Sequence, residues 1–247
     1  MTPPRPRPLP IAGIAAALAD GRRTFAASRG FSLAFGALFA AIGSLMIWGA
    51  QWFALAPMTP ALIGGFLLVG PIVMAALIGA AEDVAAGRRP SLTRVIGSMR
   101  RAPAGLWALA LFCLLIYLIW ITDAGTLYSF MIGEPRSGFV QALPTAAGNE
   151  HFHLFSGLMG FALANVVYAV TVHAVPLMVR RRTPLATAVV ASVRACFASP
   201  LVHGAWALTL AAGIFVSMSL PPLLCVSLPI LAYAGDSLNR RCFDSPP

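Results

Sequence analysis

Hydrophobic residues dominate four long stretches of the chain that contain no formally charged side chain when histidine is counted as neutral. These stretches are residues 30–81, 102–122, 151–179 and 195–235. An α-helix needs about 20 apolar residues to cross roughly 30 Å of hydrocarbon, because it rises about 1.5 Å per residue. By length, the four stretches therefore predict two, one, one and two membrane-spanning helices.

Proline-containing turns divide the two longest stretches. The turns are residues 56–60 and 219–222, and they separate segment 31–55 from segment 61–81 and segment 201–218 from a last segment that ends near residue 235. Proline removes a backbone donor and obstructs the preceding helical turn, so paired prolines inside an apolar stretch are typical of a tight hairpin. The chain is therefore predicted to be all-α, with six transmembrane helices.

The sixth segment is the shortest. As a helix, residues 221–235 extend only about 22 Å, and Pro229 interrupts them. The segment crosses the bilayer only if Ser237 and Leu238 continue the helix, with Asp236 near the headgroups. A re-entrant hairpin is the alternative. We favour six spans, because an even number agrees with the arginines found at both ends of the chain.

The charged residues indicate an orientation. Only 10% of the 247 residues are charged and 59% are hydrophobic, whereas a soluble domain carries about 25% charged residues. All 17 basic residues are arginine, and sixteen of them lie on one side of the predicted spans, with Arg136 alone on the other. Basic loops face the cytoplasm, so we expect a bacterial inner-membrane protein with both termini cytoplasmic. The net charge of +9 then reflects topology, and no nucleic-acid partner is expected.

Four regions follow from this reading. We expect a disordered Pro-rich arm at 1–10, an interfacial helix at 11–28, one six-helix transmembrane domain at 29–240 and a cytoplasmic tail at 241–247. The segment at 11–28 imitates a signal peptide, but Ile11, Ile14 and Phe25 fall on one helical face while Arg22 and Asp20 lie off it. That amphipathic pattern favours an uncleaved helix at the membrane surface.

Two cytoplasmic loops resemble each other at a constant offset of 93 residues. The offset aligns Arg88-Arg89 with Arg181-Arg182, Leu92 with Leu185 and Arg101 with Arg194. Apolar residues at spacings of three and four predict an amphipathic helix, or elbow helix, in each loop. Two parallel span–elbow–span repeats are therefore expected, as in some transporters; duplication of a scaffold is the alternative. The arginines expected to meet anionic lipid headgroups are Arg88, Arg89, Arg94, Arg100, Arg101, Arg180, Arg181, Arg182 and Arg194.

Several motifs carry a family resemblance. Residues 67–71 (Leu-Leu-Val-Gly-Pro), 175–178 (Val-Pro-Leu-Met) and 191–195 (Ala-Ser-Val-Arg-Ala) resemble the bacterial membrane family named domain of unknown function 2189. The resemblance covers about residues 11–240 and implies a six-helix integral membrane protein, with no catalytic residue to transfer. Family members often have a histidine-rich pattern at the end of the last span, where this chain has Ala-Tyr-Ala-Gly-Asp-Ser at 232–237.

Polar residues in spans four and five form the first candidate site. Ionisable groups inside a span are functional candidates by default. His173 and His203 both fall in the cytoplasmic half of their spans, where they could face each other. Together with neighbouring polar groups they could line a polar cavity; the full set is Asn165, Tyr168, Thr171, His173 and His203. A neutral imidazole hydrogen-bonded between helices is the simpler alternative.

A second cluster resembles a metal-ligand set. Glu150, His151 and His153 lie at the outer start of span four. On a strand, alternate residues share a face, so this set could hold a metal ion. Polar residues at that position more often mark the membrane interface, so we expect no metal and no other cofactor.

No common enzyme motif appears, and membrane enzymes usually carry clustered acids and histidines at one depth. We therefore expect no enzymatic activity. Two roles remain: a transporter-like or permease-like protein or a transport-associated subunit, and a non-catalytic scaffold or assembly factor for another membrane complex. The expected partners are the lipid bilayer and either another membrane protein or a second copy of the chain.

Overall fold

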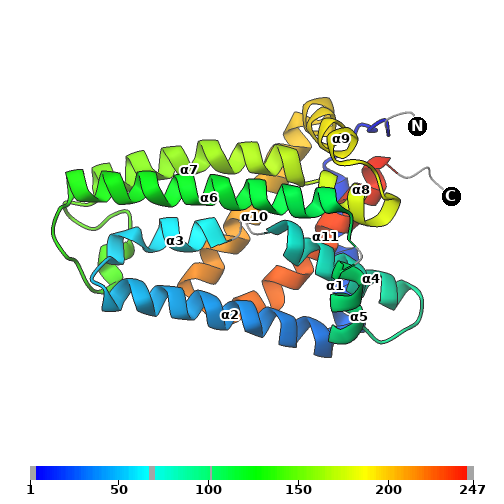
Figure 1. The fold of residues 1–247 in the computed structure, drawn as a ribbon, viewed down its shortest axis with the longest axis horizontal. Coiled ribbons are helices and arrows are strands. Elements are labelled where there is room, and N and C mark those ends of the chain that lie inside the picture. The colour runs from blue at the N-terminus through cyan, green and yellow to red at the C-terminus, as the bar shows by residue number, and fades with distance from the viewer. Residues whose placement is uncertain (1–3, 67–69, 101, 244–247) are drawn as a thin grey trace. The chain divides into compact units, whose positions relative to one another are not determined.

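The computed structural model describes residues 4–66, 70–100 and 102–243, and in this part of the chain every regular element is a helix (Figure 1). Five described segments are long and apolar enough to cross a membrane. They are α2 (Arg29–Trp52), α6 (Ala104–Met131), α7 (Glu150–Thr171) taken with α8 (Ala174–Arg181), α10 (Pro200–Ser219), and α11 (Leu224–Phe243) with the short turn before it. The all-helical prediction is confirmed, and the chain is a multi-pass membrane protein.

The predicted second span is described as two helices. They are α3 (Thr59–Phe66) and α4 (Gly70–Ala85). Residues 67–69, which begin the Leu-Leu-Val-Gly-Pro motif, lie outside the described residues, as does Arg101. The preceding turn is a 3₁₀ helix, η1 (Ala56–Met58), where Pro57 occupies the first helical turn.

The last predicted segment is a full helix. α11 continues through Ser237 and Leu238 to Phe243 although Pro229 lies inside it. A short 3₁₀ helix, η4 (Pro221–Leu223), precedes it at the predicted hairpin. The structure thus extends this segment well beyond residue 235, so it has the length that a span requires.

The two predicted elbow regions are helical. They form α5 (Leu92–Arg100) and α9 (Leu185–Ala198). α9 begins after Pro184, and α10 follows directly after Ser199. Proline has no N–H to donate, so it is well tolerated at the start of a helix.

Internal contacts divide the chain into two compact units, which are described separately. The first unit comprises residues up to 40, 71–110 and 168 onward, and the second comprises residues 41–70 and 111–167. In the first unit, α1 (Ala12–Ala27) packs along α11. Gly21 makes this approach close, because a Cβ at its position would collide with the backbone of Ile230 and Ala234.

α1 buries Gly13, Ile14, Ala17 and Gly21, whereas Ile11 at its start is 63% exposed. The position of its apolar face at the membrane surface stays a prediction. Small residues face α11 because they allow the two backbones to come together. Residues 1–3 of the predicted arm lie outside the described residues, and residues 4–10 form no helix. The arm is nevertheless hydrogen-bonded to other segments: the Arg7 N–H donates to the Cys242 carbonyl, and the Leu9 N–H donates to Ser199 Oγ.

The second unit is packed mainly through aromatic rings. Trp120 fills the space left by Gly64 and Gly160, where a Cβ would collide with its indole. Tyr128 and Phe152 meet edge to face, with ring centroids 5.8 Å apart. In the α6–α7 loop, which includes η3 (Phe139–Ala142), Arg136 donates to Asn149 Oδ1 at 2.7 Å.

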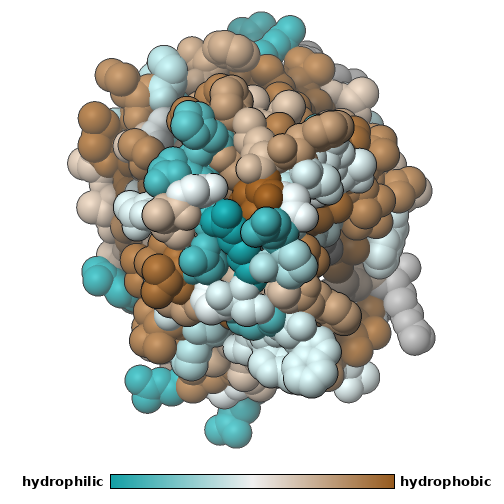
Figure 2. Space-filling model, turned by 90° about the vertical axis from the view of Figure 1, so that its left-hand side faces the viewer, coloured by the Kyte–Doolittle hydropathy of each residue, from teal (hydrophilic) through white to brown (hydrophobic). Residues whose placement is uncertain are grey.

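The surface of the helices is apolar, as a lipid-facing surface must be. Exposed large side chains along the candidate spans include Trp48, Leu111, Phe161, Leu208 and Phe215. Figure 2 views the side that carries the α6–α7 loop, where a group of hydrophilic side chains lies near the middle and hydrophobic side chains cover much of the remaining surface.

Candidate functional site

The predicted fourth span is broken at His173. α7 ends at Thr171 and α8 begins at Ala174. Pro176 explains the break, because it has no N–H to donate to the carbonyl of Val172, and its ring crowds the preceding turn. The predicted span therefore contains an interruption at this point, and the interruption frees the backbone N–H of His173 from the helical ladder.

Ser192 of α9 bridges the break. The His173 N–H donates to Ser192 Oγ at 3.1 Å, and Ser192 Oγ donates to the Ala169 carbonyl at 2.7 Å. In an unbroken helix the N–H of residue 173 would donate directly to the carbonyl of residue 169. The hydroxyl thus replaces one link of the helical hydrogen-bond ladder, and α9 is attached to the broken helix at that link.

The side chain of His173 meets that of His203 on α10. Their Nε2 atoms are 2.8 Å apart, and the rings are nearly perpendicular. His173 Nδ1 lies 3.1 Å from Asn239 Oδ1 on α11, and His203 Nδ1 lies 2.9 Å from the Ser199 carbonyl. His173 is fully buried, and His203 and Asn239 are each 3% exposed. We call His173, His203, Asn239 and Ser192 the histidine cluster.

Two aromatic residues complete the surroundings. Tyr168 of α7 donates its hydroxyl to the His203 carbonyl at 3.0 Å. The ring of Phe243 meets that of His173 edge to face, with centroids 5.4 Å apart. The cluster is therefore enclosed by side chains from α7, α8, α9, α10 and α11.

The structure brings together only part of the predicted polar set. Tyr168, His173 and His203 meet, and Thr171 ends α7 two residues before His173. Asn165 is exposed, and its amide donates to the Phe161 carbonyl one turn earlier on α7. His173 and His203 are buried, and their ring nitrogens are hydrogen-bonded to each other.

Ser192 and Asn239 were not among the predicted residues. Both become partners of His173 only because α9 and α11 pack against the break, which is a tertiary arrangement. The one local signal was Pro176, three residues after a histidine inside an apolar stretch, where it predicts a break.

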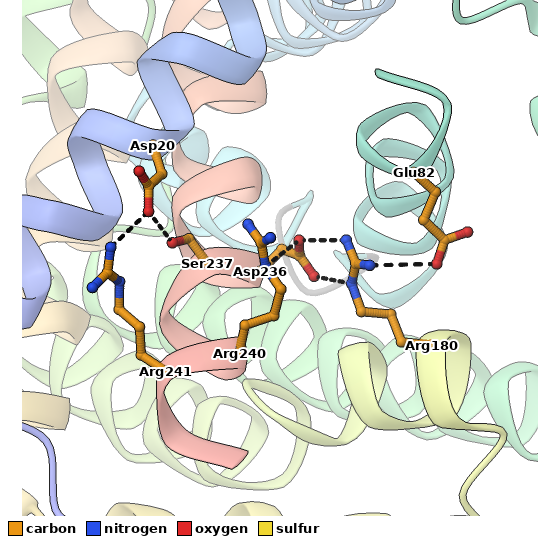
Figure 3. A network of polar contacts seen from close by, with 7 residues as sticks. All are labelled: Asp20, Glu82, Arg180, Asp236, Ser237, Arg240 and Arg241. Atoms are coloured by element: carbon orange, nitrogen blue, oxygen red, sulfur yellow. Dashed lines mark hydrogen bonds and ion pairs between the residues drawn. The ribbon is translucent and has the colours of Figure 1, made fainter. Parts of the chain in front are cut away.

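A chain of ion pairs joins other helices of the first unit (Figure 3). Arg180 of α8 binds both oxygens of Asp236, with its Nε 2.6 Å from Oδ1 and its Nη2 2.7 Å from Oδ2. The same guanidinium lies 3.6 Å from Glu82 of α4, and Arg240 Nε lies 3.6 Å from Asp236 Oδ2. The side chain of Asp236 is only 1% exposed, and its carboxylate is enclosed by cationic partners. Its expected position near the headgroups stays a prediction.

Asp20 of α1 ends this part of the network. It accepts hydrogen bonds from Ser237 Oγ and Arg241 Nη2 of α11, both at 2.7 Å (Figure 3). The hydrogen bond from Ser237 is the largest cause that lowers the pKa of Asp20, with further lowering by Arg241 and Arg23, while partial burial opposes it. These bonds hold α1 against α11.

Several predicted interface arginines bind protein groups instead of projecting freely. Arg88 and Arg94 both pair with the buried carboxylate of Asp83, at 2.8 and 3.3 Å, and Arg181 donates to the Phe243 carbonyl. Arg94 also donates to the Arg89 carbonyl. Arg194 is exposed, and Arg182 ends α8 in the left-handed backbone region. Arg101 and the side chain of Arg100 lie outside the part of the chain that the structure describes.

The weak metal candidate rested on strand geometry, and that premise is wrong. Glu150, His151 and His153 begin α7, where alternate residues point to nearly opposite sides. His151 is exposed, while His153 Nε2 is buried without a hydrogen-bond partner. Among the described residues, no group of three or more His, Cys, Asp or Glu side chains could hold a metal ion.

Comparison with protein families matches residues 58–180 to a family described as a predicted integral membrane protein (DUF2189). The matched region includes the broken helix up to Arg180 but excludes His203 and Asn239. No curated protein and no solved structure matches the chain.

Proposed function

We propose that this chain, which belongs to the DUF2189 family of predicted integral membrane proteins, is transporter-like or permease-like or is a transport-associated subunit, with the histidine cluster as its functional centre. The observation that carries the proposal is the break at His173. Irregular backbone at membrane depth is tolerated only where protein or a water-filled cavity surrounds it. Many secondary transporters bind substrates and coupling ions at such discontinuous helices.

The composition of the cluster adds to this support. An ionisable side chain inside the membrane is costly and usually serves a function. Here two imidazoles from different helices are in direct contact, and the backbone beside one of them is interrupted. A protein that needed only packing could fill the same space with apolar side chains.

For the topology, we propose six spans with both termini cytoplasmic in a bacterial inner membrane, and α3 and α4 together as the second span. The support is the arginine distribution. A C-terminal green fluorescent protein fusion should fluoresce, and a C-terminal alkaline phosphatase fusion should be inactive. Active phosphatase at the C-terminus would contradict this orientation.

The repeat proposal is supported by the starts of the two elbow helices. α5 begins at Leu92 and α9 at Leu185, which are equivalent positions at the offset of 93. We propose that both lie at the cytoplasmic interface, where their arginines meet anionic lipid. Binding to vesicles that contain anionic lipid should then exceed binding to neutral vesicles and should weaken with added salt.

A scaffold role is the second candidate. It is favoured by the pairing of His173 and His203, since both ring nitrogens of each have a hydrogen-bond partner. Such pairing also serves to hold helices together. A pull-down from native membranes in mild detergent tests for an obligate partner or a homodimer.

The distinguishing experiment compares His173→Leu with His151→Leu, an exposed histidine of the same candidate span. Each variant is reconstituted in liposomes, and solute-induced currents are recorded for a panel of small ions and metabolites. We expect a current in the wild type and in His151→Leu, and at least about a tenfold loss in His173→Leu, with folding checked by the melting temperature. A wild-type current in His173→Leu would contradict the assigned role.

A further inference from the structure

The hydrogen-bond partners of the histidine pair determine how many protons it holds. His203 Nδ1 lies 2.9 Å from the Ser199 carbonyl oxygen. A carbonyl can only accept, so this ring nitrogen must carry a proton and donate. A neutral imidazole has one N–H, so a neutral His203 has a bare lone pair on Nε2.

The same reasoning applies to His173. Its Nδ1 lies 3.1 Å from Asn239 Oδ1, which is also an acceptor only. Nδ1 therefore carries the proton, and a neutral His173 also has a bare lone pair on Nε2. These two Nε2 atoms are the ones that lie 2.8 Å apart.

The orientation of the rings excludes a sideways contact. The ring centroids are 5.1 Å apart, so the line between the Nε2 atoms runs nearly along the line between the ring centres. Each Nε2 thus directs either its lone pair or its N–H at the other. Two lone pairs repel, so a hydrogen bond at this distance requires a proton between them.

We infer that the His173–His203 pair is a site for one proton, which lies between the two Nε2 atoms when Asn239 turns its Oδ1 toward His173. The proton comes from water, and the pair then has three N–H groups and one positive charge. When the proton leaves, the Asn239 amide rotates and donates from Nδ2 to His173 Nδ1. The remaining proton of His173 moves to Nε2 and donates to His203, so two neutral imidazoles remain.

Among the residues that the structure describes, no carboxylate is in direct contact with the pair. Tyr168 of α7 binds the His203 carbonyl, and Phe243 of α11 lies against His173. The charged groups near Asn239 along α11 are Asp236, Arg240 and Arg241. Asp236 is paired with Arg180 of α8, which also approaches Glu82 of α4, and Arg241 is paired with Asp20 of α1. Further titratable groups on the helices that enclose the cluster are the thiols of Cys196 on α9 and Cys242 on α11. The other charged or titratable groups on these helices are Glu150, His151 and His153 of α7, Arg181 of α8, Arg194 of α9, and Cys225 and Tyr233 of α11.

Because the shared proton binds both rings, the pair gains one proton in a single step rather than two in succession. A second proton would place two cations in contact. This inference deepens the proposed function, because it assigns the proton as the coupling ion of the proposed transporter. That assignment rests on the proposed function.

Nitrogen NMR of the protein in lipid bilayers tests the proton count directly. The chain has four histidines, so a variant with His151→Gln and His153→Gln leaves only the pair. After labelling with ¹⁵N-histidine, we expect three protonated ring nitrogens at about pH 5 and two at about pH 8. A coupling between the two Nε2 nuclei should be present in both forms.

A variant of Asn239 tests the role of the amide. Asn239→Asp offers only acceptor atoms to His173 Nδ1, so it should keep three protonated nitrogens across the whole range. Asn165→Asp, which changes an exposed amide on α7, should leave the step of the histidine pair unchanged. If Asn239→Asp does not fold, the count in the double histidine variant still decides the proposal.

A count of two protonated nitrogens throughout, or a rise to four, would overturn the inference. The transport assay separates this result from the proposed function. Loss of transport in His173→Leu with a constant count of two overturns the proton site alone. A step from two to three with no transport for any solute overturns the proposed function and leaves the proton site standing.

Discussion

The two compact units are stabilised by different chemistry. The first buries polar and charged groups, among them His173, Asn239 and Asp236, and each has a partner on another helix. The second unit is held chiefly by rings, with Trp120 seated against Gly64 and Gly160 and Tyr128 against Phe152. The contrast shows where specificity lies: ring packing needs matching shapes, whereas the polar contacts need particular partners in particular protonation states.

The largest effect is expected from removing a buried partner in the first unit. Asp236→Asn should lower the free energy of unfolding by about 3 kcal/mol, because it leaves Arg180 without its bidentate carboxylate. Glu82→Gln is the matched control, since Glu82 is 46% exposed and contacts the same arginine at 3.6 Å; its effect should be below about 1 kcal/mol. Unfolding in mixed micelles measures both. Equal losses would remove the distinction between the buried and the exposed pair.

A change of shape should have the next largest effect, in the second unit. Gly160→Ala should lower the free energy of unfolding by about 2 kcal/mol, because the new methyl group collides with the Trp120 indole. Gly157 of the same helix has open space around it. Gly157→Ala should therefore cause no loss and raise stability by up to about 1 kcal/mol. If Gly160→Ala leaves the free energy of unfolding unchanged, the packing around the Trp120 ring is loose.

The bridge at the broken helix should contribute less. Ser192→Ala leaves the His173 N–H without its acceptor and should lower the free energy of unfolding by about 1–2 kcal/mol. Ser129→Ala, an exposed serine that bonds only the Gly125 carbonyl of its own helix, should change it by less than about 0.5 kcal/mol. Thermal unfolding in detergent compares the two variants. If Ser192→Ala leaves the free energy of unfolding unchanged, water replaces the hydroxyl as the partner of the His173 N–H.

The smallest effect concerns pH. The pKa of Asp20 is lowered from 3.8 by the hydrogen bond from Ser237 and by Arg241. A lowered pKa stabilises the fold fully above the unfolded value, and this contribution is lost as the pH falls below 3.8 through the folded value. The melting temperature of the wild type should therefore fall more steeply in this range than that of Asp20→Asn. Parallel pH profiles would exclude this contribution.

Hydropathy predicted the positions of the long apolar helices, but it did not predict a helix break that depends on one missing N–H group. The charge-free stretches located α2, α6, α10 and α11, because lipid requires continuous apolar helices. They did not reveal the break at His173, since hydropathy averages do not register the N–H that Pro176 lacks.

Partners that are distant in the sequence could not be predicted. His173 and His203 were predicted as residues that could face each other, because both fall at a similar depth in adjacent spans. Asn239 lies 66 residues from His173 and Asp236 lies 56 from Arg180, and no local pattern links them. The packing of α1 on α11 also lay beyond the sequence pattern, because it depends on the small residues Ala17 and Gly21, which allow the close approach.

The hydroxyl of Ser192 also has a mechanical consequence. It occupies a link of the α7–α8 backbone ladder while belonging to α9. When α9 is pulled along its axis, it must either carry His173 with it or detach from the ladder. A load applied to α9, whether from a docked protein or from a change in bilayer thickness, is thereby transmitted to the histidine pair as tension in two hydrogen bonds.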